Sequence, residues 1–439
     1  MPKAEAHILD AGHFTLDTAA DEIASLVRGF VGSSGWRVWR ATLAEAAIGK
    51  PVPSEPKASL LRYWWKRTCA MIANALYLAC IQPELMEEQS GDSVPTSQET
   101  NLSDSGFVHT VERDPSAGWN LTNLSYRDPK DLRNNLEVRI VPEAGANLYS
   151  MKLGETELLA VPNNLSDLSG FRYGFPVLYP TPNLVRDSQF DFDGRTFKFI
   201  PNEGPHFLHG LVHSLSWEAS VPWSDSNGAG LTASLDWTPA QPAFPLFPIV
   251  HRLSLNFLLH SRGVKFEFTV ENLDDKRLPF GFALHPWFRV LGSRAGTWLQ
   301  VPAQKHMEAI DLLPTGTLKD LEGSVLDLRN FVSLEPLDLD DVYWGMSPDR
   351  PAAYVSYDEK IKVSLTGSAE FTHMVVYTPR GSPFFCMENQ TCSTDAHNLF
   401  GRGFEKEAHL LIVERGKQMT GWVQVEVGRL DQGASTKSS

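Results

Sequence analysis

The run Lys265-Phe266-Glu267-Phe268-Thr269-Val270 decides the fold class, because apolar and polar residues alternate along it. This period of two gives a β-strand one apolar face for a core and one polar face for water. The run Leu136-Glu137-Val138-Arg139-Ile140 repeats the pattern. From Trp119 to Leu430 many such short runs alternate with Gly, Pro, Asn and Asp, and long helical periodicity is absent. An all-β protein built as a large β-sandwich is therefore predicted.

The character of the chain changes along its 439 residues, which exceed one ordinary domain. We assign the sandwich to residues 117–430, since a domain of about 310 residues can bury roughly three-quarters of its unfolded surface. A short, partly helical extension precedes it. Within residues 33–116 we expect one helix, Ala58–Ile81, followed by a polar linker rich in Glu, Ser and Pro. Residues 431–439 are expected to form a disordered tail.

Composition excludes several classes of protein. The net charge of −14 disfavours non-specific nucleic-acid binding, which usually needs a basic face. The four cysteines are too few and too scattered for a disulfide scaffold, and their spacing does not match a zinc pattern. The N-terminus lacks the pattern of a secretory signal, and the longest apolar run, Cys69–Ile81, is shorter than the about 20 residues of a membrane span. We expect a cytoplasmic protein with reduced thiols and no nucleic-acid or membrane partner.

Three stretches place ionisable side chains among aromatic and apolar residues. Glu388 follows the apolar run Phe384–Met387 and precedes a polar loop, so we expect it at a strand end facing a cleft, where partial burial suits a general base. His285 precedes a proline and is flanked by Trp287, which indicates a restricted, partly dry site. His209 stands before a glycine in a predicted turn. Taken singly, Glu388 is equally compatible with a structural role in its own turn. A lone histidine such as His285 or His209 is more often a hydrogen-bonded structural residue.

Five stretches taken together resemble the aldose 1-epimerase family. In chain order they are GFPVLYP (174–180), NLVRDSQFDFDGRTF (183–197), LHG (208–210), ALHPWF (283–288) and ENQTCSTDAHNL (388–399). The resemblance covers almost all of residues 119–428. It implies a large β-sandwich of the galactose-mutarotase type, the supersandwich, with an open sugar cleft.

The resemblance also implies a mechanism that needs neither a metal nor an organic cofactor. Ring opening of an aldose delivers a proton to O5 and removes one from the C1 hydroxyl, so one acid and one base on opposite sides of the ring suffice. His285 would be the acid and Glu388 the base. His209 would be the second, substrate-binding histidine, and Trp287 would form an aromatic wall. Asp340 best matches the aspartate that accepts hydrogen bonds from sugar hydroxyls, and Asp341, one residue on, is the close alternative.

The chain departs from the family at one position. Many relatives carry an Asn-Arg pair where this sequence has Asn183-Leu184, and a leucine cannot replace the charge or the five donors of arginine. If the strand continued, Arg186 would lie on the same face as Leu184 and would cover the loss; the alternative is that the binding specificity differs. We therefore expect Asn183 and Arg186 among the substrate-binding residues.

Three functional interpretations remain open beside an aldohexose epimerase. A hexose-6-phosphate mutarotase would need basic residues converging on the phosphate, and the candidates are Arg172, Arg186, Lys198 and Arg289. A catalytically silent carbohydrate-binding module would keep the cleft without the reaction. The third places function in residues 1–32, which resemble the C-terminal tail of an α/β-hydrolase with His13 at the triad position. No G-x-S-x-G nucleophile precedes His13, so we expect no hydrolase chemistry from it. The sequence does not decide the oligomeric state.

Overall fold

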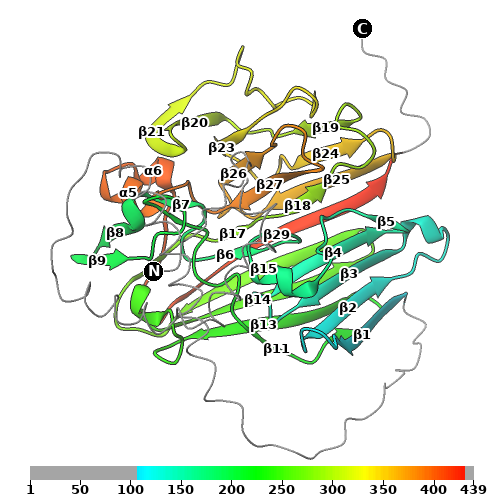
Figure 1. The fold of residues 1–439 in the computed structure, drawn as a ribbon, viewed down its shortest axis with the longest axis horizontal. Coiled ribbons are helices and arrows are strands. Elements are labelled where there is room, and N and C mark those ends of the chain that lie inside the picture. Colours follow the sequence, from blue (N-terminus) through cyan, green and yellow to red (C-terminus); the bar gives the residue numbers. More distant parts are fainter. Residues whose placement is uncertain (1–105, 431–439) are drawn as a thin grey trace, which may run out of the picture. The chain divides into compact units, whose positions relative to one another are not determined.

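Residues 106–430 are described by a computed structural model, and two large antiparallel sheets form their framework (Figure 1). The larger sheet has ten strands in the order β11-β13-β14-β15-β29-β25-β24-β19-β22, with β12 also pairing with β13. Its strands are β11 (Glu218–Ala219), β12 (Trp223–Ser224), β13 (Ala229–Trp237), β14 (His251–His260), β15 (Gly263–Asn272), β19 (Thr297–Gln300), β22 (Val332–Ser333), β24 (Ala352–Ser356), β25 (Ile361–Gly367) and β29 (Gln418–Arg429).

The second sheet has eight strands in the order β21-β20-β23-β26-β27-β17-β6, with β18 also pairing with β27. Its strands are β6 (Val177–Leu178), β17 (Ala283–Leu284), β18 (Trp287–Arg289), β20 (Lys305–Ile310), β21 (Leu313–Lys319), β23 (Asp340–Trp344), β26 (His373–Tyr377) and β27 (Phe384–Gln390). Asp340, Glu388 and Trp287, three of the candidate site residues, belong to strands of this sheet.

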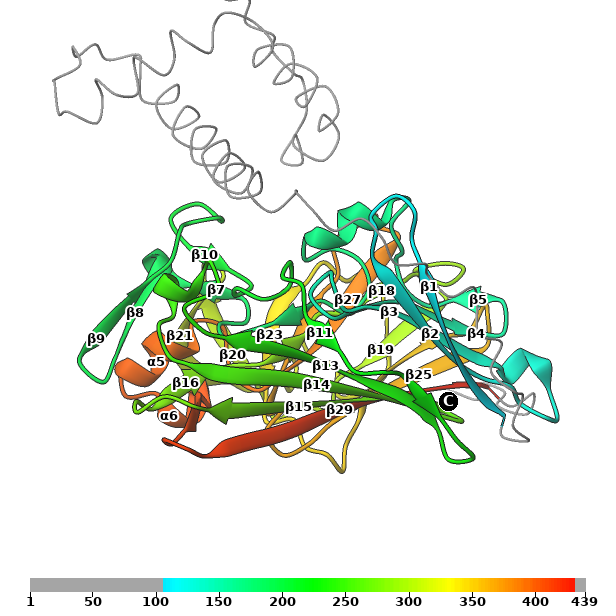
Figure 2. The same cartoon turned by 90° about the horizontal axis from the view of Figure 1, so that it is seen from below.

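A five-stranded sheet in the order β1-β2-β3-β4-β5 lies beside the ten-stranded sheet (Figures 1 and 2). Its strands are β1 (Phe107–Arg113), β2 (Asn120–Tyr126), β3 (Leu136–Val141), β4 (Asn147–Leu153) and β5 (Thr156–Glu157). Strand β1 pairs with β2 along all seven of its residues, although the sequence predicts a linker there. Most of β1 is exposed, so its polar composition concealed the strand. The ordered sheet begins at Phe107, ten residues before the expected boundary at 117.

The remaining elements are short. The two-stranded sheets pair β7 (Leu184–Val185) with β10 (Phe207–Leu208), β8 (Gln189–Phe192) with β9 (Arg195–Lys198), and β16 (Leu278–Phe280) with β28 (Leu411–Val413). The helices are α5 (Ala396–Gly401) and α6 (Glu405–Ala408), and the 3₁₀ turns are η1 (Leu132–Asn134), η2 (Leu165–Ser169), η3 (Arg186–Ser188) and η4 (Phe244–Leu246). Among residues 106–430, no helix is long and apolar enough to cross a membrane.

The core forms where the apolar strand faces meet, as the alternation in β15 predicts. Phe266 and Phe268 are about 1% exposed, whereas Lys265 and Glu267 lie on the opposite face. The ring of Phe268 stacks on Phe282 with centroids 4.5 Å apart. Full burial of one such side chain contributes about 1.5–3 kcal/mol. The prediction of an all-β sandwich is confirmed.

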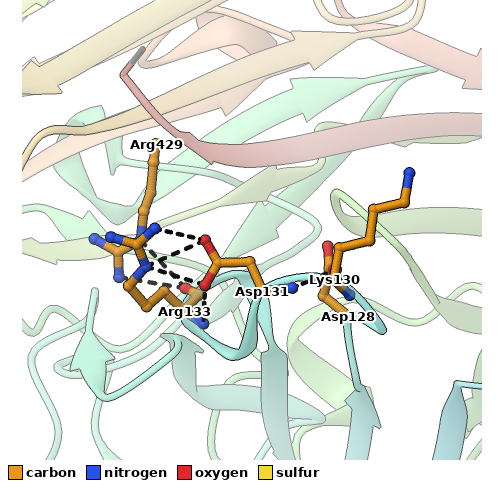
Figure 3. Close-up of polar contacts among 5 residues, drawn as sticks. All are labelled: Asp128, Lys130, Asp131, Arg133 and Arg429. Atoms are coloured by element: carbon orange, nitrogen blue, oxygen red, sulfur yellow. Dashed lines mark hydrogen bonds and ion pairs between the residues drawn. The ribbon is translucent and has the colours of Figure 1, made fainter. Parts of the chain in front are cut away.

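Polar contacts connect the end of β29 to the turn before β3 (Figure 3). The Arg429 guanidinium donates to the carbonyl oxygen of Arg133 at 3.2 and 3.3 Å. The Arg133 guanidinium in turn binds the Asp131 carboxylate at 2.8 Å, and these hydrogen bonds hold the pKa of Asp131 below its usual value. Asp128 accepts from the backbone N–H of Lys130. Water screens this exposed network, so it fixes the local geometry more than it adds stability.

The partly helical extension that the sequence predicts, with its Ala58–Ile81 helix and His13, and the predicted tail at 431–439 fall on residues outside the described part of the chain.

Candidate functional site

Strand register places four of the site's side chains in one row across the eight-stranded sheet. Asp340 in β23 pairs with Tyr377 in β26, Tyr377 pairs with Cys386 in β27, and Cys386 pairs with Trp287 in β18. Directly paired residues of antiparallel strands share one face of a sheet. The row therefore presents a carboxylate, a phenol, a thiol and an indole along a single surface, over the strands labelled in Figure 1.

Glu388 lies one step further along β27, on the same face as Cys386 because side chains alternate along a strand. It sits inside the strand, two residues before its end, and is only 2% exposed. Its Oε2 accepts from the side-chain amide of Gln390 at 3.1 Å. This burial is deeper than the strand-end position that the sequence predicts.

His285 meets Glu388 from the neighbouring segment between β17 and β18. Its Nε2 lies 3.3 Å from Oε1 of Glu388, and the histidine is 4% exposed. The backbone N–H of His285 donates to the carbonyl of Pro176 at 3.1 Å, which fixes the segment against β6. The two catalytic candidates, 103 residues apart in the sequence, therefore form a buried acid–base pair.

The environment favours the uncharged form of both partners. Burial lowers the pKa of His285 to about 3, and the nearby His213 acts in the same direction. Burial also raises the pKa of Glu388 well above its usual value, and the negative charge of Asp340 raises it further. An imidazole and a carboxylic acid hold one proton between them, the same number as an imidazolium and a carboxylate. The pair can therefore exchange that proton without changing its net charge.

Two more histidines and a phenylalanine surround His285. The His209 ring lies 5.1 Å from the His285 ring, nearly perpendicular to it, and burial lowers the pKa of His209. His213 is also buried, and burial lowers its pKa to about 4. The ring of Phe171 packs edge-on against His209, with centroids 4.5 Å apart, and lies 6.5 Å from His285.

The turn that presents His209 requires backbone that few residues adopt. His209 and Gly210 have φ values of 67° and 74°. A Cβ on Gly210 would come within 2.3 Å of the Tyr179 carbonyl oxygen, so only glycine fits there. The glycine after His209 therefore permits the turn that positions the histidine.

Trp287 packs against one face of the His285 ring. Its indole stacks on the imidazole with centroids 5.0 Å apart and an interplanar angle of 4°. Its Nε1 donates to the carbonyl oxygen of Phe171 at 2.9 Å. The side chain is 7% exposed in total, so the structure uses Trp287 to orient the histidine and to hold the Phe171 loop.

The structure separates the two aspartates that the sequence left as alternatives. Adjacent residues of β23 point to opposite faces, and Asp341 binds Nε2 of His306 at 2.9 Å. Asp340 faces the row instead. Asp340 is solvent-exposed as a residue, but partial burial of its carboxyl group and the negative charge of Asp341 raise its pKa to about 6. Of the two, Asp340 is the carboxylate close enough to Glu388 to raise the pKa of that group.

Arg186 does not join this cluster. Its Nε lies 3.4 Å from Oδ2 of Asp395, and its backbone N–H donates to Oδ1 of the same residue at 2.9 Å. It lines a separate cavity of about 300 Å³ together with His397 and Arg402. Strand β7 ends at Val185, and η3 begins at Arg186. The expected two-residue alternation from Leu184 to Arg186 is therefore broken.

Asn183 and Leu184 make local hydrogen bonds and packing contacts. The side-chain oxygen of Asn183 accepts from the backbone N–H of Leu184 at 2.8 Å, and its carbonyl accepts from the His209 N–H at 3.0 Å. Leu184 is 4% exposed and pairs with Leu208. The leucine thus fits the core at this position, and Asn183 positions His209 through the backbone.

The four candidate phosphate-binding residues do not converge. Arg172 lies near the row, since its charge opposes the rise that burial causes in the pKa of Tyr377. Arg289 lines another cavity, of about 250 Å³, among Glu155, Glu157 and Glu359. Lys198 is exposed on β9.

Sequence reasoning missed four members of the site: Phe171, His213, Tyr377 and Cys386. The His-x₃-His spacing of His209 and His213 was a usable signal. Tyr377 and Cys386 become neighbours of Trp287 only through strand register, which the sequence does not reveal.

The fold is that of a β-sandwich of the galactose mutarotase-like class. A galactose mutarotase-like protein from Clostridium acetobutylicum shares 20% identity, with 74% of this chain and 99% of that chain covered at a TM-score of 0.67. A galactose 1-epimerase from Lactobacillus acidophilus shares 17% identity, with 74% and 98% covered at a TM-score of 0.58. A GalM/aldose epimerase homologue from C. elegans shares 17% identity, with 67% and 96% covered at a TM-score of 0.56. At these identities the structures establish the fold alone.

The sequence gives the closer assignment. Residues 131–426 match the aldose 1-epimerase family. The chain belongs to this family, and its expected resemblance to it is confirmed. Membership supports a mutarotase-like function within the carbohydrate epimerases.

Proposed function

We propose that this protein is an aldose 1-epimerase that interconverts the α and β anomers of an aldohexose, with His285 and Glu388 as its acid–base pair. The observation that carries the proposal is the buried contact of 3.3 Å between His285 Nε2 and Glu388 Oε1, in a chain of this family. The two atoms that exchange protons in the reaction, O5 and the C1 hydroxyl oxygen, are bonded to the same carbon. A close acid–base pair can therefore serve both from one side, rather than from opposite sides of the ring.

The proton transfers balance. As the C1–O5 bond breaks, Glu388 takes the C1 hydroxyl proton and His285 delivers its proton to O5. The aldehyde then turns about the C1–C2 bond. As the ring closes, His285 takes the proton of the attacking O5 hydroxyl, and Glu388 returns a proton to the carbonyl oxygen. The pair ends with the single proton with which it began.

The surrounding residues supply binding and orientation. Asp340 lies near Glu388 and is solvent-exposed, as an acceptor for sugar hydroxyls requires. His209 and Trp287 pack on the imidazole of His285 from two directions. A fixed imidazole orientation matters because proton transfer requires hydrogen-bond contact with the reacting oxygen.

Polarimetry of freshly dissolved α-D-glucose and α-D-galactose tests the proposal. Wild type should accelerate the relaxation of optical rotation, and His285→Asn and Glu388→Gln should each remove most of the acceleration. Matched controls are His373→Asn, a buried histidine bonded to the Glu407 carbonyl, and Glu267→Gln, on the outer face of β15. Circular dichroism should show all four variants folded.

Three results distinguish the alternatives. Acceleration only with the 6-phosphates would indicate a hexose-6-phosphate mutarotase. Sugar binding by calorimetry without any acceleration would indicate a carbohydrate-binding module. Full activity of Glu388→Gln would remove this residue from the mechanism.

A further inference from the structure

Cys386 brings a thiol to the acid–base pair, and the proposed reaction does not use it. The thiol is fully buried on the same face of β27 as Glu388. One ring nitrogen of His285, Cys386 Sγ and a Glu388 oxygen lie within 4.8 Å of one another. An imidazole, a thiol and a carboxylate are three of the side-chain ligands that zinc prefers.

The spacing of these atoms fits a tetrahedral ion. With zinc bonds of about 2.0–2.3 Å, two ligand atoms at a tetrahedral angle lie roughly 3.3–3.6 Å apart. The separation of 3.3 Å between His285 Nε2 and Glu388 Oε1 matches one such edge. From the upper bound of 4.8 Å, the thiol would have to move inward by roughly 1.5 Å at most to complete such an edge.

Charge also matches a divalent cation. A thiolate, a carboxylate and a neutral imidazole carry two negative charges together, so a bound Zn²⁺ would leave the buried centre neutral. Buried charges are tolerated when they are compensated in this way. The fourth tetrahedral position would remain for water or a substrate oxygen.

We propose that His285, Cys386 and Glu388 form a zinc-binding site whose occupancy blocks the acid–base pair. Zinc takes the nitrogen and the oxygen that exchange protons with the sugar, so metal and sugar turnover exclude each other. The inhibitory part rests on the proposed function, whereas metal binding does not. The ligands come from segments 101 residues apart, Cys386 following His285, which is why the spacing of cysteines in the sequence gave no zinc pattern.

Titration of the full-length, metal-free protein with Co²⁺ tests the site directly, because cobalt bound to a thiolate shows a near-ultraviolet charge-transfer absorption. Wild type should develop this band, and an excess of Zn²⁺ should abolish it. Cys386→Ser should lack the band and bind Zn²⁺ more than about 100-fold more weakly, since losing even an outer-shell partner costs 10–100-fold. Cys392→Ser is the matched control, because Cys392 is also a buried free thiol but lies outside the cluster.

A band that persists in Cys386→Ser, or equal Zn²⁺ affinity in that variant and wild type, would overturn the site. Polarimetry at rising Zn²⁺ tests the inhibition separately. The rate of wild type, relative to its own metal-free rate, should fall at Zn²⁺ concentrations at which Cys386→Ser retains its rate. Equal sensitivity of the two proteins would overturn the regulatory claim. A protein that binds cobalt through Cys386 but never accelerates mutarotation would keep the site and remove the proposed function instead.

Discussion

Glu388 and Asp395 are both buried carboxylates, and both belong to the stretch 388–399 that resembles the sugar site of the family. Their hydrogen-bond partners differ, and so do the roles that we infer for them. Asp395 accepts from the backbone N–H of Arg186, from its Nε and from the amide of Asn398. Glu388 has the amide of Gln390 as a fixed donor and the imidazole of His285 as its other partner.

The donors account for the different proton affinities. Burial raises the pKa of both acids, but the hydrogen bonds from Arg186 and Asn398 oppose the rise at Asp395. At Glu388 the negative charge of Asp340 reinforces it. A carboxylate saturated with donors holds a loop together, whereas one with few donors beside another titratable group can take up and release protons.

Glu388→Gln removes the carboxylate that we propose to be reactive, and it should give the largest loss of activity among the variants. The rate acceleration in polarimetry should fall by about 10²–10⁴-fold, the usual contribution of one general acid or base. The side chains have nearly the same shape, so sugar affinity and thermal stability should change little. A loss of activity accompanied by unfolding would show a structural role instead.

Asp340→Asn and Asp341→Asn sharpen the comparison by testing which carboxylate faces the sugar. Asp340→Asn should weaken sugar binding by about 10-fold or more, because a hydrogen bond to a charged group contributes roughly 1.5–3 kcal/mol. Asp341→Asn, which loses only the pair with His306, should bind sugar almost normally. Calorimetric titration of both variants measures the difference, and the reverse ranking would place Asp341 in the cleft.

Asp395→Ala removes the carboxylate to which we assign a structural role. It removes the acceptor of three donors, so the free energy of unfolding should fall by about 1–3 kcal/mol in urea titrations. The rate per folded molecule should stay within a few-fold of wild type. Asp275→Ala, at an exposed position, is the control. A loss of activity of about 100-fold with unchanged stability would place Asp395 among the catalytic groups.

Arg186→Gln should give the smallest effect. The side chain is 40% exposed, and its pair with Asp395 is screened by water, so the stability change should be below about 1 kcal/mol. The Michaelis constant for the sugar should change less than about threefold in the polarimetric assay. A large rise would show that Arg186 leaves Asp395 to bind the substrate.

The pH dependence follows from the same pair. The one-proton state of His285 and Glu388 exists above the pKa of His285, about 3, and below the raised pKa of Glu388. As the pH rises through the Glu388 pKa, the pair loses its proton and the rate should fall. The same two shifts act on stability, because below pH 4.5 the unfolded chain protonates both groups, whereas the folded pair still holds one proton. The free energy of unfolding contributed by the pair should therefore decrease as the pH falls from about 4.5 towards 3. Rate and urea profiles against pH measure both effects.

The sequence could predict much of this picture because some residues report their surroundings locally. Alternation in β15 gave the sandwich, and a histidine before a proline and an aromatic residue indicated a restricted site. The row from Asp340 to Trp287 could not be predicted, because it depends on the register of four strands. Arg186 was assigned to the sugar site on the assumption that β7 continues, and a 3₁₀ turn ended it instead. Strand β1 was not predicted, because an exposed edge strand shows little apolar alternation in its sequence.

The most direct test of the account is polarimetric comparison of His285→Asn, Glu388→Gln and the double variant, each confirmed as folded. Two residues that exchange one proton act as a unit, so the double variant should be about as slow as the slower single variant. If the two losses multiply instead, His285 and Glu388 act independently, and the shared-proton mechanism is wrong.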